Sequence, residues 1–265
     1  MRTISSRHNP VVAAFRALAT TPDPAGRRVL LDGPHLIGEA LDAGLDFEVI
    51  LVAASRSASG TEAGRLAHEL ERRGLPIVEA DDRAFDAVSP VRSPSGIAAI
   101  ALRAPSAPAL LCDRADAFVL VVADVQDPGN VGALLRSAEA GGVTGAFVTG
   151  ASANPFSWKA LRGSMGSALR LPTATGLAPE AIMAEMRQAG MRVIASVARG
   201  GADPDGVSWK GSVGLWIGGE GHGLADDLVE RCDERVTIPM APQVESLNAA
   251  VAGALLVYAA RRQRT

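Results

Sequence analysis

The chain has 265 residues, 48% of them apolar, which allows one large domain or two smaller ones that each bury a core. The formal net charge of −3 gives no overall attraction to a polyanion. The two lone cysteines, Cys112 and Cys232, argue against a disulfide framework and against a zinc site, and they favour a reducing, cytoplasmic location. We also expect no metal, signal peptide or membrane span, because the histidines lack ligand spacing and no uncharged run approaches ~20 apolar residues.

The first hundred residues alternate helix and strand patterns, which predicts a small α/β domain. Apolar residues at helical spacing, ended by glycines, indicate the helices, and short β-branched runs indicate the strands. The predicted helices span residues 8–19, 33–44 and 61–74, and the predicted strands span 47–54, 75–80 and 96–102.

A proline-containing segment from Leu102 to Asp116 predicts a linker, so we expect one domain over residues 1–106 and a second over 107–265. The second region reads as a series of strands each followed by a helix, which predicts an α/β fold with a parallel sheet. We expect strands at 118–125, 145–150, 191–197, 213–220 and 235–240, and helices at 130–142, 157–168, 179–190, 225–232 and 247–260.

Ligands of such sheets bind beyond the carboxyl ends of the strands, so the turns at those ends carry the functional prediction. After the first strand, Asn130 is placed to cap the next helix, and Arg136 follows six residues later on an otherwise apolar helix. Either Asn130 only caps and Arg136 only extends to solvent, or the two face a polar substrate.

The turn after residue 217 contains Gly218, Gly219, Gly221 and Gly223, which would let a ligand approach the backbone closely. It matches neither the GxGxxG dinucleotide fingerprint nor the phosphate-binding P-loop, so a dinucleotide enzyme is disfavoured. Glu220 lies inside this turn, as an anchor for the loop or as a functional carboxylate.

The third polar turn precedes the last helix. Ser246 is a natural cap for a helix that starts at Leu247, whereas capping alone does not explain Glu245 or Asn248. The three turns together offer no histidine or cysteine nucleophile and no acid–base pair. They suit an adenosine-type cofactor held by backbone groups and a hydroxyl held by side chains.

Three segments in order, "DVQDPGNVGALLRSAEAGGV", "LWIGGEGHGL" and "VTIPMAPQVESLNAAVAGALLVY", resemble the motifs of the SpoU family of RNA ribose 2′-O-methyltransferases. These belong to the SPOUT class of S-adenosylmethionine enzymes, whose chain end forms a trefoil knot, an exception to unknotted topology. The segments "ISSRHNPVV", "LLDGPHLIGEAL" and "SPSGIAAIAL" resemble the family's L30e-like substrate-binding domain, with Asp32 where a glutamate is common.

The resemblance implies a site and a cofactor, S-adenosyl-L-methionine. Arg136 would act on the ribose 2′-hydroxyl, as a base or as an orienting group, because a guanidinium is a poor base. The other catalytic positions would be Asn130, Glu220, Ser246 and Asn248. The cofactor would contact three loops, at Ala195, Ser196 and Val197, at Ile217, Gly218, Gly219 and Glu220, and at Ile238, Met240, Ser246 and Leu247.

The resemblance also implies a homodimer through the C-terminal domain, with the apolar last helix buried against a second copy. RNA binding needs local positive charge, and residues 1–28 carry five arginines against one acid. We expect RNA contacts from Arg7, Arg27, Arg28 and Arg162. Ribosomal (23S) RNA is the preferred substrate; the alternatives are transfer RNA and a non-catalytic RNA-binding protein of the same fold.

Overall fold

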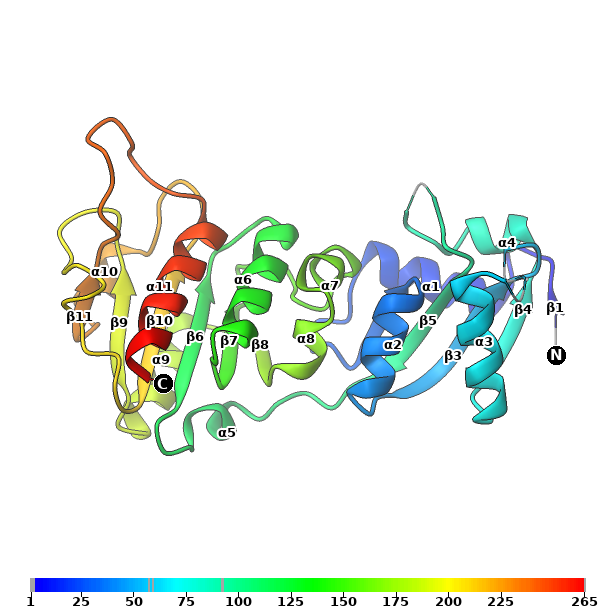
Figure 1. Cartoon of the computed structure of the whole chain (residues 1–265), viewed down its shortest axis with the longest axis horizontal. Helices are drawn as coiled ribbons and strands as arrows, with labels where there is room; N and C mark the ends of the chain where they lie inside the picture. The colour runs from blue at the N-terminus through cyan, green and yellow to red at the C-terminus, as the bar shows by residue number, and fades with distance from the viewer. Residues whose placement is uncertain (1–2, 57, 59, 92, 265) are drawn as a thin grey trace.

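A computed structural model describes residues 3–56, 58, 60–91 and 93–264 of the chain. In this described part the strands form two sheets, one of five strands and one of six, which lie along the long axis of the molecule (Figure 1). Arg2, one of the five N-terminal arginines, lies outside the described residues.

The N-terminal sheet is mixed, with the strand order β1-β4-β3-β5-β2 among the described residues. Strand β5 runs antiparallel to both of its neighbours, β3 and β2. The elements of this half are β1 (Thr3–Ile4), α1 (Pro10–Thr20), β2 (Arg28–Asp32), α2 (Pro34–Asp42), β3 (Asp46–Ala53), α3 (Glu62–Arg72), β4 (Ile77–Ala80), α4 (Asp82–Asp86) and β5 (Ile97–Leu102).

The C-terminal sheet has the order β11-β9-β10-β6-β7-β8, and all its described strand pairs are parallel, as the sequence predicts. Its elements begin after the short helix α5 (Pro108–Cys112), which lies in the predicted linker. They are β6 (Phe118–Ala123), α6 (Pro128–Ala140), β7 (Gly145–Thr149), α7 (Trp158–Ser164), α8 (Ser167–Arg170), β8 (Thr173–Leu177), α9 (Pro179–Gln188), β9 (Arg192–Ser196), β10 (Val213–Gly218), α10 (Asp226–Glu230), β11 (Glu234–Val236) and α11 (Ala249–Arg264).

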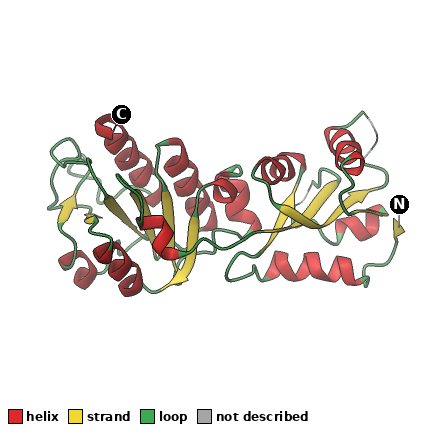
Figure 2. Ribbon diagram, turned by 90° about the horizontal axis from the view of Figure 1, so that it is seen from below, coloured by secondary structure: helices red, strands yellow, loops and turns green. Residues whose placement is uncertain are grey.

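Helices cover both faces of the C-terminal sheet (Figure 2). Alternate residues of β6 explain this arrangement, because Leu120 and Val122 pack towards α6 and α11 while Val119 and Val121 pack towards α5 and α9. Every residue of β6 is buried, which is why its sequence is a continuous apolar run. Helices α6 and α11 lie side by side on one face (Figure 1).

The two halves share packing across their junction. One hydrophobic cluster contains residues of α2 and β2 as well as residues of α6 and β6, and Phe156 belongs to it. The guanidinium of Arg103 lies 3.9 Å from the centre of the Phe156 ring. Burial lowers the pKa of Arg103 to about 10, although nearby Asp23 acts in the opposite direction. Across the same junction, Asn154 donates a 2.9 Å hydrogen bond to the Asp23 carbonyl.

Three expectations about the elements are wrong. The helix predicted at 157–168 breaks into α7 and α8 because Met165 and Gly166 both have positive φ, and a Cβ on Gly166 would lie 2.7 Å from Glu39. Strands β1, β2 and β8 and the short helices α4 and α5 were not expected. The last strand ends at Val236 rather than residue 240, since Pro239 has no N–H to donate to a strand ladder.

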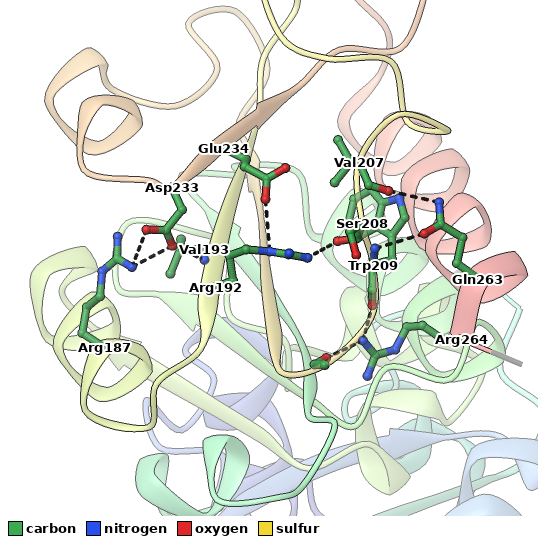
Figure 3. Close-up of polar contacts among 11 residues, drawn as sticks. Arg187, Arg192, Val193, Val207, Ser208, Trp209, Asp233, Glu234, Gln263 and Arg264 are labelled. Atoms are coloured by element: carbon green, nitrogen blue, oxygen red, sulfur yellow. Dashed lines mark hydrogen bonds and ion pairs between the residues drawn. The ribbon is translucent and has the colours of Figure 1, made fainter.

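The end of α11 is fixed to the connection between β9 and β10 (Figure 3). The Gln263 side chain accepts a hydrogen bond from the backbone N–H of Trp209 at 3.2 Å and donates one to the Val207 carbonyl at 3.0 Å. Arg264 donates to the carbonyls of Trp209 and Gly211. The start of the same connection is bonded to β11 and to the residue after it, because Ala202 donates to the Arg235 carbonyl and accepts from the Thr237 N–H.

Candidate functional site at the carboxyl edge of the C-terminal sheet

Four neighbouring strands end together at one edge of the C-terminal sheet. The register pairs Ser196 at the end of β9 with Val236 of β11, and pairs Gly218 at the end of β10 with Ala123 of β6. The loops that follow these strands therefore leave the sheet at the same edge, which is where parallel sheets bind ligands. Three of them are the loops for which the sequence predicts cofactor contacts.

The end of β10 has a strand partner on one side only. Its pairing with β9 stops at Trp216, opposite Ala195, while its pairing with β6 continues through Ile217 to Gly218. Backbone groups at the end of β9 and β10 are thus available beside a loop of glycines. Backbone groups and small residues at this edge fit an adenosine-type cofactor better than a metal or a dinucleotide.

The first two glycines of that loop have a structural role that the sequence interpretation missed. A Cβ on Gly219 would lie 1.9 Å from the Asp124 carbonyl oxygen, and a Cβ on Gly218 would lie 2.2 Å from the backbone of Gly223. The loop folds back on itself through a hydrogen bond from the Gly223 N–H to the Gly219 carbonyl at 3.2 Å. These glycines are therefore required by the protein's own backbone, and not only by the approach of a ligand.

Three of the predicted polar residues meet in a hydrogen-bonded chain. The side-chain amide of Asn130 donates to the Glu220 carboxylate, and Asn248 donates to the Asn130 side-chain oxygen at 3.1 Å. The three residues come from α6, from the glycine loop and from the residue before α11; Glu220 and Asn248 are exposed and Asn130 is half-buried. These hydrogen bonds thus connect three segments that are far apart in the sequence, at the edge where the loops converge.

The structure corrects both predicted helix caps. Asp127, rather than Asn130, caps α6, since its carboxylate accepts the Asn130 N–H at 2.9 Å. Asn248, rather than Ser246, caps α11, since its side-chain oxygen accepts from Ala250 at 2.9 Å and from Val251 at 3.2 Å. Capping therefore accounts for Asn248. Ser246 is exposed and has no hydrogen-bond partner among the described residues.

The caps give a direct stability prediction. Asn248→Ala removes the cap of α11, so we expect the free energy of unfolding to fall by about 1 kcal/mol. Ser246→Ala removes no cap, and we expect thermal unfolding at the wild-type temperature. Thermal denaturation of both variants at one protein concentration checks this; equal losses, or a loss for Ser246→Ala alone, would contradict the assignment of the cap.

Arg136 lies apart from the hydrogen-bonded side chains of Asn130, Glu220 and Asn248. Six residues along a helix place it about 9 Å further along the axis of α6 than Asn130 and about 120° around it. It is exposed and lines an open hollow of about 450 Å³ together with His35 of α2 and Arg170 of α8. The residues that line this hollow with Arg136 include none from the three cofactor loops.

Arg170 forms ion pairs with two carboxylates near Arg136. It forms a two-pronged ion pair with Glu139, at 2.8 and 2.7 Å, and a second ion pair with Glu39 of α2. Within the described residues no carboxylate pairs with Arg136. The ion pairs of Arg170 were not predicted from the sequence, because its partners are distant in the chain and give no local signal.

The expected RNA contacts do not form one patch. Arg7 follows β1 and Arg28 begins β2, and the register places the end of β1 and the start of β2 at opposite ends of the N-terminal sheet. Arg28 is also paired with Glu48 at 2.8 and 2.7 Å. Arg27 and Arg7 are exposed. The grouping of these arginines as a single surface is wrong because the direction of β2 was not predicted.

Arg162, the fourth expected RNA contact, belongs to α7 and faces the N-terminal half. It lines a second hollow of about 480 Å³ with Asp32, Ser93 and Ser95. Burial raises the pKa of Asp32, opposed by a 2.6 Å hydrogen bond from Ser89 and by the charge of Arg162. Arg162 is thus at the junction of the two halves.

Other chemistries find little support in the described residues. Both cysteines are free, and burial raises the pKa of each thiol to about 11, so neither is a thiolate nucleophile at neutral pH. Over the described ranges, no three histidine, cysteine or acidic side chains gather as metal ligands would. Nor does the described part of the chain contain a helix of the length and hydropathy needed to cross a membrane.

Comparisons with known proteins agree on one family. Residues 117–258 match the model of the SpoU rRNA Methylase family. The chain is 30% identical over 260 residues to the 23S rRNA (guanosine(2553)-2′-O)-methyltransferase RlmP of Bacillus subtilis, covering 97% of this chain and 98% of that protein.

Solved structures with bound cofactor are also similar. The AdoMet-bound rRNA methyltransferase of Sinorhizobium meliloti superimposes with a TM-score of 0.85 and 26% identity, covering 98% of this chain and 97% of that one. The SpoU methyltransferase AviRb of Streptomyces viridochromogenes, in complex with AdoMet, gives a TM-score of 0.86 and 26% identity, with 97% and 98% covered.

Proposed function

The chain belongs to the SpoU rRNA methylase family, and we propose that it transfers the methyl group of S-adenosylmethionine to a ribose 2′-hydroxyl of ribosomal RNA. The observation that carries this proposal is the hydrogen-bonded chain of Asn130, Glu220 and Asn248 where the strand-end loops converge. Since ribosomal RNA is its proposed substrate, the protein would work in the cytoplasm.

The cofactor site consists of the three loops predicted from the sequence. Ala195 to Val197, Ile217 to Glu220 and Ile238 to Leu247 border the edge where β10 lacks a strand partner. S-adenosylmethionine supplies an electrophilic methyl group when it is bound. The residues of this chain then have to fix the position of the hydroxyl that accepts the methyl group and let its proton leave.

Arg136 is the residue that we assign to the ribose hydroxyl. An arginine guanidinium is charged at neutral pH, which makes it a donor that orients an oxygen rather than a base that removes a proton. Its exposure in an open hollow would give the hydroxyl proton a path to water when the ribose oxygen takes the methyl group and the sulfur–methyl bond of the cofactor breaks. Asn130, Glu220 and Asn248 hold the cofactor side of the site, and Ser246 is free to contact either ligand.

The separation of Arg136 from the cofactor loops supports a homodimer as the active form. Helix α11 exposes an apolar stripe of Val251, Leu255 and Tyr258, each 48–49% accessible. Such a stripe suits a two-fold interface, which would be isologous. Because α6 lies beside α11, a second copy packed on this stripe would bring its own α6 towards the cofactor loops of the first.

The trefoil knot of the SPOUT class is consistent with the contacts around α11. The connection from residue 197 to 212 is bonded at its start to β11 and the residue after it. At its end it is bonded to Gln263 and Arg264 (Figure 3). Contacts at both ends of the connection support a path in which it surrounds the chain end, as threading through a loop would require. We therefore assign the knot to residues 197–264.

We assign RNA binding to an L30e-like domain of residues 1–106 and methyl transfer to residues 107–265. The mixed five-stranded sheet of the first part and the parallel sheet of the second support this division. Because Arg162 projects from the second part to a hollow of the first, RNA bound at the junction would contact both. We place ribosomal RNA ahead of transfer RNA as the substrate because the relative from Bacillus subtilis modifies 23S rRNA.

Label transfer from S-adenosylmethionine tests the proposal. Protein-free 23S rRNA and bulk transfer RNA are incubated separately with the enzyme and labelled cofactor. We expect incorporation into the ribosomal RNA alone. Incorporation into transfer RNA alone would overturn the substrate class, and no incorporation into either, with cofactor binding intact, would favour a non-catalytic RNA-binding protein.

The RNA surface can be tested separately through the salt dependence of binding. Removal of one arginine that touches a phosphate should reduce the slope of log K against log salt by about 1, so we expect this from Arg7→Ala and from Arg162→Ala. Arg28→Ala is the matched control, because Arg28 is already paired with Glu48. An unchanged slope in both test variants, or an equal change in the control, would remove these residues from the surface.

A further inference from the structure

The hollow beside Arg136 is built by both halves of the chain. His35 comes from α2, Arg136 and Glu139 come from α6, Met165 lies in the turn between α7 and α8, and Arg170 comes from α8. Its volume, about 450 Å³, lies within the range of small-molecule sites and is large enough for one nucleoside. The residues on its walls therefore decide which chemical group fits beside Arg136.

Met165 is the unusual residue of this hollow. Its backbone is left-handed, with φ 50° and ψ 42°, a conformation that residues other than glycine and asparagine rarely adopt. Its side chain is 41% exposed, although a long apolar side chain is normally buried. The fold requires a turn here, and the partly exposed methionine at its tip presents apolar surface to the hollow. Strained positions of this kind concentrate at functional sites.

Among the described residues, the charges of the hollow leave the guanidinium of Arg136 without a carboxylate partner. Arg170 holds Glu139 in a two-pronged ion pair and also binds Glu39. Glu139 is three residues from Arg136 on α6, close enough to pair with it, but its carboxylate is already bound. The hollow therefore combines an apolar wall, Met165, with an uncompensated cation, Arg136. A nucleoside presents an apolar base face and a hydroxyl-bearing sugar, which match these two features.

We propose that this hollow receives the nucleoside to be methylated, with Met165 lying against the face of its base while Arg136 contacts its ribose. The proposal rests on the proposed function and adds a residue that positions the RNA substrate. Contact with the face of a base tolerates any base, so Met165 strengthens binding of the nucleotide without selecting its identity.

Equilibrium binding of 23S rRNA, together with KM and kcat for methyl transfer, tests the proposal. Met165→Ala should raise the Kd and KM for RNA about fivefold to tenfold, at the lower end of base-stacking losses, with S-adenosylmethionine binding unchanged. Met165→Leu keeps the apolar wall and should stay close to wild type. Leu110→Ala is the matched control, because Leu110 is also an exposed apolar residue, 66% accessible, but lies on α5 away from the hollow.

Met165→Gly separates the side chain from the backbone. Glycine adopts the left-handed conformation without strain, so this variant should fold at least as well as wild type and lose RNA affinity as Met165→Ala does. Wild-type affinity in both variants would overturn the proposal, and so would a loss in Met165→Leu equal to that in Met165→Ala. If the wild type binds RNA but transfers no methyl group, the proposed function fails, whereas the Kd values still decide the role of Met165.

Discussion

Arg136→Ala should lower kcat for methyl transfer by about 10²–10⁴-fold, the range typical of a residue that acts directly on the reacting group. The reason is geometric, because Arg136 is the guanidinium of its hollow that has no carboxylate partner among the described residues. Binding of S-adenosylmethionine, measured by calorimetry, should be unchanged, since the cofactor loops are elsewhere in the same chain. Thermal stability should also be unchanged for an exposed side chain.

Two further variants make that result specific. Arg136→Lys keeps the charge but not the planar fork, and we expect it to recover only part of the activity. Arg231→Ala removes an exposed arginine at the end of α10, on the opposite face of the sheet, and should leave kcat unchanged. Near-normal turnover by Arg136→Ala would show that another group orients the hydroxyl, and our assignment of this residue would then be wrong.

Gly219→Ala should damage both the stability of the protein and its affinity for the cofactor. The added Cβ would lie 1.9 Å from the Asp124 carbonyl oxygen, so the glycine loop or the end of β6 has to move. Overpacking of this kind costs about 1–3 kcal/mol. Because the same loop borders the cofactor site, we expect the Kd for S-adenosylmethionine to rise about tenfold or more, which corresponds to about 1.4 kcal/mol.

The matched control is Gly206→Ala in the connection between β9 and β10. A Cβ there would meet only the Asp203 carbonyl oxygen, at 3.4 Å, so neither the unfolding temperature nor cofactor affinity should change. Calorimetric titration of both variants compares the two sites directly. If Gly219→Ala binds the cofactor as well as Gly206→Ala does, the loop is not part of the cofactor site.

The fold of the C-terminal half was predictable because its strands are buried on both faces. Runs such as the one in β6 are continuously apolar and are separated by helices with clear ends, so the parallel sheet follows from the pattern. β8 was missed because its sequence, Thr173 to Leu177, is short and contains a glycine with positive φ. β2, Arg28 to Asp32, is equally short and was also missed, and with it the strand direction that separates Arg28 from Arg7.

The candidate site was predictable in its parts and not in its arrangement. Asn130, Glu220 and Asn248 each stand out as polar residues at strand ends, and the structure brings them together. The prediction of the capping residues was wrong because each helix has two candidate caps within three positions of each other. The path of the chain into the helix decides which of the two caps it. The ion pairs of Arg170 span 31 residues or more, so no local pattern reveals them.

The central claim is that the methyl group is transferred to a ribose oxygen, and nucleoside analysis of the product tests it most directly. Ribosomal RNA methylated by the enzyme is digested completely to nucleosides, and fragmentation in a mass spectrometer locates the added methyl group on the sugar or on the base. We predict that the added methyl group stays with the sugar fragment and that the phosphodiester linkage next to the methylated ribose resists alkali. A methyl group found on the base fragment would contradict the account, because Arg136 and the hollow around it would then serve a different acceptor atom.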